Sequence, residues 1–263
     1  MPDSKLILLT SFKGGVGKST VAANLAYKLA KKGKRTLLCD LDFDLGTLDL
    51  ITGCEDRMLF DICDAVYGRR SVEDCAVKFT SSPSLYLLGA PFSLRDEIEP
   101  EDFAQRLKGV CGGFDYVFLD TPGADSVTLA AAALCAGEAI VVATHNPASI
   151  RGAEKTAASL SEKGLSSRLI INCFDAQSAE NSSRAGILSM IDMTKTPLLG
   201  VIPYDRVMMF AQEKGVLSDG DGFISSQAFE NVISRIEAFK NGRRPVPVLY
   251  KVKGIRRKKV LTK

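Results

Sequence analysis

The sequence predicts a single-domain, doubly wound α/β fold, in which a mostly parallel sheet is flanked by helices. Seven short apolar runs are continuous rather than alternating, which is typical of strands that are covered by helices on both faces. Segments with helical periodicity lie between these runs, and no Pro-, Gly- or Ser-rich linker interrupts the chain before residue 241. A chain of 263 residues, 46% of them hydrophobic, is long enough to bury one large core.

The predicted elements follow one another in a regular order. The first helix shows the pattern, since Val21, Leu25 and Leu29 form one apolar stripe and Gly33 follows as a stop signal. The predicted strands cover residues 6–10, 35–40, 85–89, 116–120, 139–144, 168–172 and 198–202. The predicted helices cover residues 18–32, 101–110, 125–134, 149–163 and 225–240. We therefore expect one domain over residues 1–240 and a separate tail over residues 241–263.

Charge is distributed unevenly along the chain. Residues 240–263 carry ten basic side chains and no acidic one, whereas the first 239 residues carry 24 basic and 31 acidic side chains. An acidic body with a basic tail indicates that the tail has an anionic partner, either a membrane surface or a nucleic acid. A solvated tail that only improves solubility is the alternative.

Cellular location and metal content can also be inferred from the composition. No apolar run reaches the ~18 residues of a transmembrane helix, and the first residues lack the charged and apolar regions of a signal peptide. We therefore expect a cytoplasmic chain whose seven cysteines are reduced and mostly buried. His145, the single histidine, is interpreted as a structural residue, and without a Cys/His cluster no structural zinc site is expected.

The strongest signal is the glycine-rich sequence Ser-Phe-Lys-Gly-Gly-Val-Gly-Lys-Ser-Thr at residues 11–20, between the first strand and the first helix. This is the context of a phosphate-binding P-loop, although Phe12 occupies the position of its first glycine. Glycines let backbone N–H groups converge on an anion at the positive end of a helix. Lys18 is predicted to contact the β and γ phosphates and Ser19 to bind Mg²⁺. The predicted nucleotide-binding residues of the loop are Lys13, Gly14, Gly15, Val16, Gly17, Lys18, Ser19 and Thr20.

Carboxylates follow two of the predicted strands. Asp40 and Asp42 end the second strand, and Asp120 ends the strand at residues 116–120. In open α/β sheets the ligand lies beyond the carboxyl ends of the strands, where carboxylates can hold metal-bound water or orient an attacking water. A carboxylate at a strand end can equally cap the turn that follows, so the residues alone leave this alternative open.

The run Lys-Gly-Gly-Val-Gly-Lys-Ser-Thr at residues 13–20 resembles the deviant Walker A motif of the MinD/ParA family of ATPases. Members of this family tolerate a residue other than glycine where Phe12 stands. The resemblance runs from about residue 5 to residue 240, is strongest to the MinD branch, and includes the Asp-Leu-Asp stretch at 40–42. It implies a slow, dimer-dependent ATPase that uses ATP and Mg²⁺. In the family, the lysine that matches Lys13 reaches across a dimer interface to the other copy's nucleotide, as an arginine finger does.

The resemblance also implies roles for residues outside the loop. Asp120 matches the aspartate that holds Mg²⁺ through water, and Asp40 lies near the metal together with Ser19. Asp42 matches the aspartate that positions the hydrolytic water, which makes Lys13, Lys18 and Asp42 the implied catalytic residues. Asn172 matches an adenine-reading asparagine, since an amide offers both a donor and an acceptor to the base. Pro203 and Asp205 match the segment on the other side of the adenine.

Two functions of this family compete. In the first, a MinD-like ATPase forms an ATP-bound homodimer, docks on the inner face of the membrane through residues 245–263 and helps to place the division site. It would work with a division inhibitor, an ATPase-activating protein or both. In the second, a ParA-like partition ATPase runs the same cycle on DNA, and ATPases that control flagellar number or placement are a near variant. The iron–sulfur relatives are excluded, because Cys111 precedes the strand that ends at Asp120, whereas their cluster cysteine follows it.

The tail favours the membrane. Leu249, Val252 and Ile255 recur at three-residue spacing among basic residues, which predicts a short basic amphipathic helix of the kind that lies on a membrane surface. A DNA-binding arm can have a similar composition, so DNA remains the less favoured partner.

Overall fold

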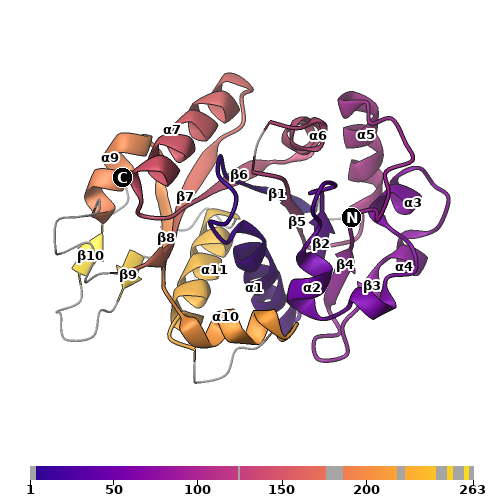
Figure 1. Ribbon diagram of the computed structural model, residues 1–263, viewed down its shortest axis with the longest axis horizontal. Coiled ribbons are helices and arrows are strands. Elements are labelled where there is room, and N and C mark those ends of the chain that lie inside the picture. The colour runs from indigo at the N-terminus through magenta and orange to yellow at the C-terminus, as the bar shows by residue number, and fades with distance from the viewer. Residues whose placement is uncertain are drawn as a thin grey trace.

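The protein is described by a computed structural model that covers residues 4–123, 125–175, 186–217, 223–240, 248–250 and 258–260. An eight-stranded sheet with the order β3-β4-β2-β5-β1-β6-β7-β8 forms its centre (Figure 1). Every pairing in it is parallel except that of β3 with β4. The predicted fold class, a mostly parallel sheet flanked by helices, is confirmed.

All seven predicted strands are present, each within two residues of its predicted bounds. They are β1 (Lys5–Thr10), β2 (Thr36–Asp40), β4 (Leu85–Leu88), β5 (Tyr116–Asp120), β6 (Glu138–Ala143), β7 (Ser167–Phe174) and β8 (Leu198–Pro203). The remaining strand of the sheet, β3 (Val77–Lys78), was not predicted. Two residues are too few to form a recognisable apolar run.

The five predicted helices are also present. They are α1 (Lys18–Lys31), α5 (Pro100–Val110), α6 (Val127–Cys135), α7 (Pro147–Glu162) and α11 (Ser226–Lys240). Several short helices were missed, namely α2 (Leu48–Thr52), the 3₁₀ turn η1 (Glu55–Arg57), α3 (Ile62–Val66), α4 (Val72–Cys75), α9 (Ile187–Thr194) and α10 (Arg206–Glu213). None exceeds eight residues, so none repeats an apolar stripe often enough to reveal its period.

The sheet separates two apolar layers. Along β1, Leu6 and Leu8 pack into one layer whereas Ile7 and Leu9 pack into the other, because successive side chains of a strand point to opposite faces. Helices α5, α6, α7 and α9 contribute to the first layer, and α1, α10 and α11 contribute to the second. The sheet is thus covered on both faces, which explains why its strands are continuous apolar runs.

The carboxyl ends of the central strands meet at one edge of the sheet. In the register of the parallel pairs, Asp120 lies opposite Leu9 on β1 and opposite Asp40 on β2. The loop after β1 leads directly into α1 at this edge. The fold therefore brings the glycine-rich loop and the strand-end carboxylates together, as the sequence predicts.

The tail differs from its prediction where it is described. Val248–Tyr250 (β9) and Lys258–Val260 (β10) form an antiparallel pair, so the predicted helix is wrong where it overlaps a described strand, at Leu249 and Tyr250. Valine and tyrosine favour strands, and Gly254 disfavours a helix by about 1 kcal/mol relative to alanine. The other tail residues, including Val252 and Ile255, lie outside the described residues. Among the described helices, none combines the length and apolarity needed to span a bilayer.

Candidate nucleotide site

The glycine-rich loop borders a cavity of about 850 Å³ at the carboxyl edge of the sheet. Residues 13–20 line one side of the cavity, Asp42 and Gly123 lie beside them, and residues of α2 and α10 form the opposite wall. Gly15 and Gly17 have φ angles of +74° and +80°, a left-handed conformation that glycine adopts readily. Gly17 caps α1 without a side-chain hydrogen bond, so the first N–H groups of this helix remain available to an anion.

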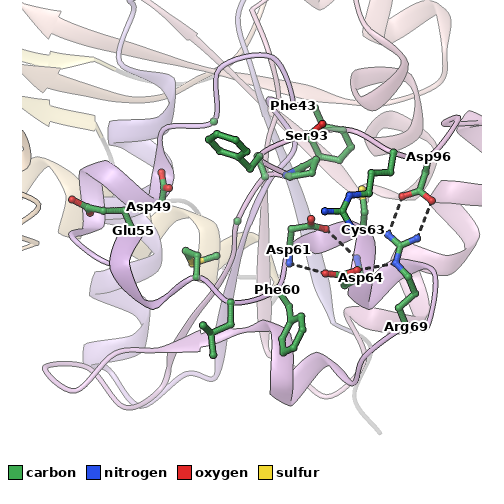
Figure 2. Close-up of a pocket in the computed structure, with 18 of the residues that line it drawn as sticks. Phe43, Asp49, Glu55, Phe60, Asp61, Cys63, Asp64, Arg69, Ser93 and Asp96 are labelled. Carbon is green, nitrogen blue, oxygen red and sulfur yellow. Dashed lines mark hydrogen bonds and ion pairs between the residues drawn. The ribbon is translucent and has the colours of Figure 1, made fainter.

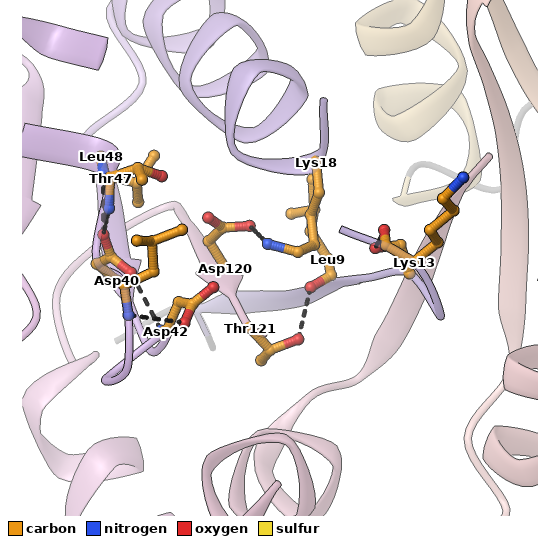
Figure 3. Close-up of polar contacts among 11 residues, drawn as sticks. Leu9, Lys13, Lys18, Asp40, Asp42, Thr47, Leu48, Asp120 and Thr121 are labelled. Atoms are coloured by element: carbon orange, nitrogen blue, oxygen red, sulfur yellow. Dashed lines mark hydrogen bonds and ion pairs between the residues drawn. The ribbon is translucent and has the colours of Figure 1, made fainter. Parts of the chain in front are cut away.

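Lys18 and Asp120 form a buried ion pair beneath the loop, with 3.0 Å between Nζ and Oδ1 (Figure 3). The second oxygen of Asp120, Oδ2, is buried and has no hydrogen-bond partner among the described residues. Burial raises the pKa of Asp120 above its ordinary value, whereas the neighbouring Lys18 and Ser19 lower it. A buried carboxylate oxygen with a free acceptor position, next to a serine hydroxyl, fits the oxygen ligation that Mg²⁺ or its bound water requires.

Asp40 organises the loop that follows β2. Its Oδ1 accepts a hydrogen bond from the N–H of Asp42 at 3.1 Å, and its Oδ2 accepts from the N–H groups of Thr47 and Leu48, both at 2.9 Å. Burial, followed by the charge of Asp120, raises the pKa of Asp40 to about 7 against the opposing effect of these hydrogen bonds. In this structure Asp40 therefore fixes the turn and the start of α2, and its role near a metal stays a prediction.

Asp42 and Lys13 lie at the cavity in contrasting ways. Asp42 is half-buried, and its Oδ1 accepts a hydrogen bond from the N–H of Leu45 at 3.3 Å. Lys13 is exposed, and its side chain points away from Lys18 and Asp120 (Figure 3). Its carbonyl oxygen is held by the hydroxyl of Ser11 at 3.0 Å. Asp42 can thus reach a ligand in its own cavity, whereas Lys13 projects toward the surroundings of the molecule.

The three residues predicted to surround the adenine do not line this cavity. Asn172 is buried behind the loop, where its Nδ2 donates to the carbonyl of Val16 at 2.8 Å while its Oδ1 has no partner among the described residues. Pro203 ends β8. Asp205 caps α10 and accepts the hydroxyl of Ser225 at 2.7 Å, so both of its carboxylate oxygens are already used within the chain. Asp205 therefore shapes this segment and has a structural role here.

Three glycines of the cavity wall were missed as site residues. A Cβ on Gly123 would lie 3.1 Å from the backbone nitrogen of Gly14. The loop after β5 can therefore approach the phosphate loop this closely because residue 123 has no side chain. Gly53 and Gly215 end α2 and α10 and contact each other so closely that a Cβ on either would lie 2.4 Å from the other's backbone. A glycine after a helical run signals a helix end in the sequence, but it does not reveal which backbone it meets.

Comparisons with known proteins agree with this geometry. Residues 4–169 match the family described as AAA domain. The septum site-determining protein MinD of Neisseria meningitidis is 30% identical over 247 residues, covering 89% of this chain and 91% of the relative. MinD of Thermotoga maritima is 31% identical over 237 residues, covering 88% and 87%.

Solved structures show the same fold. The MinC:MinD cell division complex of Aquifex aeolicus contains a chain with a TM-score of 0.82 and 29% identity, covering 89% of this chain and 96% of that one. MinD of Pyrococcus horikoshii, complexed with Mg-ADP, has a TM-score of 0.78 at 24% identity, covering 92% and 100%. The fold, the phosphate loop and these relatives together show that the chain belongs to the MinD/ParA family of deviant Walker A P-loop ATPases.

Proposed function

We propose that this protein is a MinD-like ATPase that hydrolyses ATP slowly as a homodimer and cycles on and off the membrane to help position the division site. The observation that carries the proposal is the Lys18–Asp120 pair, with its open carboxylate oxygen at the N-terminus of α1. A positive helix end and a buried lysine border the cavity there, and the acceptor for Mg²⁺ lies buried against that lysine, which is the arrangement that a triphosphate needs.

Each residue of the loop has a defined task in this proposal. The N–H groups of residues 14–20 bind the phosphates, and Lys18 moves from Asp120 to the β and γ phosphates. Ser19 and Asp120 would hold Mg²⁺, with Asp40 nearby, and the ion would supply positive charge against the charge that develops on the phosphates. Asp42 orients the attacking water, since it lines the cavity beside the loop.

Lys13 acts in the other copy of the dimer. Its exposed position directs its charge away from its own Lys18–Asp120 pair, so a second copy facing the cavity would receive that charge at its γ phosphate. Asn172 and Pro203 are proposed to flank the adenine, and Asp205 to hold the backbone that approaches it.

The tail provides membrane attachment. Residues 245–263 bind an anionic lipid surface, so the protein is cytoplasmic when free and peripheral on the inner face of the membrane when it is ATP-bound. A solved relative is a MinC:MinD complex, which supports a division-inhibitor partner for this chain, and an ATPase-activating protein is a further candidate.

A ParA-like partition ATPase is the second candidate, favoured by the ten basic side chains of residues 240–263, which would also bind DNA.

Two measurements test both candidates. Phosphate release is measured with ATP and Mg²⁺, and sedimentation of the protein with anionic vesicles is then compared with its sedimentation with DNA. Hydrolysis with ATP-dependent vesicle binding supports the MinD-like proposal. Hydrolysis with binding to DNA alone contradicts it and supports the ParA-like function.

A further inference from the structure

Helix α10 connects two parts of the proposed nucleotide site that lie apart. Its first turn follows Pro203, in the segment proposed to flank the adenine, and its last residues line the cavity opposite the phosphate loop. Its eight residues, at 1.5 Å each, bridge about 12 Å. One short, rigid element therefore extends from the proposed base position to the wall of the phosphate cavity.

The start of α10 is firmly held. Asp205 is buried, accepts two N–H groups of the helix through Oδ1, and accepts the hydroxyl of Ser225 at 2.7 Å through Oδ2. The N–H of Tyr204 donates to the carbonyl of Phe174 at 3.2 Å, two residues after Asn172 on β7. The first turn of α10 is thus tied to the strand end that carries the other residue proposed to flank the adenine.

The end of α10 is in backbone contact with the end of α2. A Cβ on Gly215 would lie 2.4 Å from the Cα of Gly53 and 3.2 Å from the carbonyl oxygen of Leu50. Because both contacting residues are glycines, no side chain lies between the two backbones that could adjust to a movement. A shift of α10 must therefore either move α2 or separate the two helix ends.

Helix α2 is in turn bonded to the turn that carries Asp42. The N–H groups of Thr47 and Leu48, at the start of α2, donate to Oδ2 of Asp40 at 2.9 Å, and the N–H of Asp42 donates to Oδ1 of the same carboxylate at 3.1 Å. The N–H of Gly46 closes the turn by donating to the carbonyl of Asp42 at 2.7 Å. A displacement of α2 therefore bears on the position of Asp42.

The loop that carries Asp42 has open space on its other side. A hollow of about 1180 Å³ is lined by this loop, by the segment from η1 into α3, and by the loop after β4. Leu45 is 74% exposed beside it, and Figure 2 shows Asp49 and Glu55 at one side of the hollow. Since the loop has room to shift into this space, its position depends on the contacts of Asp40 and of α2.

We propose that α10 is a strut that makes hydrolysis depend on the base of the nucleotide. Adenine seated at Pro203 fixes α10, and the contact of Gly215 with Gly53 then holds α2 and the turn at Asp42 in place for the attacking water. The two glycines are positioning residues, because they act through Asp42. This inference rests on the proposed function and adds that the base serves catalysis as well as affinity.

A substrate without a base separates these two effects. A base that only adds affinity lowers KM and leaves kcat unchanged, whereas a base whose binding energy holds the catalytic turn raises kcat. Phosphate release is measured for the natural chain with ATP and with ribose 5-triphosphate, which keeps the sugar and the three phosphates. We expect kcat to be at least about fivefold higher with ATP, the lower end of the usual coupling between two sites.

The variant Gly215→Ala tests the strut, with Gly164→Ala as its matched control. Both glycines follow a helix with φ angles of +65° and +75°, and both donate their N–H to the carbonyl three residues earlier at 2.9 Å. Nothing lies within 4 Å of a Cβ at Gly164, so only Gly215→Ala pushes on a second backbone. The ratio of kcat with ATP to kcat with ribose 5-triphosphate should fall close to one in Gly215→Ala and stay at its natural value in Gly164→Ala.

A milder variant acts at the other end of the strut. Ser225→Ala removes the hydroxyl that Asp205 accepts and adds no atoms, so it loosens the start of α10 and should lower the same ratio at least about twofold, as other coupled pairs do. It decides the question if Gly215→Ala does not fold.

The ratio distinguishes the strut from general damage, which lowers kcat for both substrates alike and leaves their ratio unchanged. An unchanged ratio in the folded variants, or equal kcat for both substrates in the natural chain, overturns the inference and leaves the proposed function standing. A natural chain that does not hydrolyse ATP contradicts the proposed function and this inference with it.

Discussion

At the scale of single residues, the two lysines of the phosphate loop show how position decides chemistry. Lys18 and Lys13 are five residues apart, yet Lys18 is buried in an ion pair with Asp120 whereas Lys13 is exposed and points outward. A buried lysine beneath a loop of N–H groups can serve only its own cavity. An exposed lysine at the rim can serve a second copy.

We predict different losses for the two alanine variants. Lys18→Ala should abolish ATP binding, since the triphosphate loses its central counter-charge and Asp120 is left as an unpaired buried acid. Lys13→Ala should bind ATP within about twofold of the natural chain but lose dimer formation and hydrolysis, by a factor of about 10³ as for an arginine finger. Fluorescent-nucleotide titration, light scattering and phosphate release check these outcomes. A Lys13→Ala dimer with normal turnover would refute the assignment in trans.

Asp40 predicts a pH dependence of stability in the nucleotide-free protein. Its pKa rises from 3.8 to about 7 on folding, chiefly through burial, so the folded state holds its proton more tightly than the unfolded state does. This contribution is complete below the unfolded pKa and is lost as the pH rises through about 7. The free energy of unfolding should therefore fall between about pH 4 and pH 7, by at most about 4 kcal/mol from this group.

Urea unfolding at several pH values measures this effect, with Asp40→Asn as the matched variant. The amide cannot titrate, so the pH slope should be shallower in the variant even if its stability is lower throughout. An equal slope in both proteins would show that Asp40 does not carry the dependence.

At the scale of elements, α2 and α10 are joined where their ends cross. Gly53 and Gly215 have φ angles of +64° and +65°. Their backbones are so close together that neither position has room for a side chain larger than a hydrogen atom. Both helices form the wall of the nucleotide cavity opposite the phosphate loop. The glycine pair therefore lets the ends of the two helices meet beside the nucleotide cavity.

Gly53→Ala should be more destabilising than Gly33→Ala. Both glycines have positive φ angles, so alanine costs about 1–2 kcal/mol at either from backbone strain. Only at Gly53 does the added methyl meet another backbone, at 2.4 Å, whereas nothing lies within 4 Å at Gly33. Overpacking adds about 1–3 kcal/mol at Gly53. The difference in urea midpoint between the two variants measures this term, and equal midpoints would mean that the helices separate freely.

The same elements show what a sequence can and cannot reveal. The seven buried strands were predictable because each is a continuous apolar run between helical segments, and the phosphate loop was predictable from its glycine spacing. The helices α2, α3 and α4 were not, since none is longer than five residues, and the start of α2 also depends on the hydrogen bonds that Thr47 and Leu48 donate to Asp40.

At the scale of the whole molecule, an acidic body is joined to a strongly basic tail. The body carries seven more acidic than basic side chains over residues 1–239 and is repelled by an anionic surface, whereas the tail is attracted to it. Where the tail is described it forms strands. We therefore expect charge attraction to contribute more to membrane binding than the insertion of a helical apolar face does. Each Lys or Arg near an anionic membrane contributes about 1 kcal/mol, and salt screens this contribution.

We therefore predict membrane binding that depends on ATP and on salt. One tail binds weakly, but two tails on an ATP dimer act together, and linkage raises avidity by about 10²–10⁴ without new contacts. The full chain should sediment with anionic vesicles in ATP more than in ADP, and salt of about 1 M, which shortens the Debye length to about 3 Å, should release it. A chain lacking residues 245–263 should stay in solution while still binding ATP, and vesicles of neutral lipid are the control.

If the truncated chain sediments with anionic vesicles as much as the full chain does, the membrane contact lies on the body. If ATP releases the full chain from the vesicles and ADP does not, the proposed cycle runs in the opposite direction.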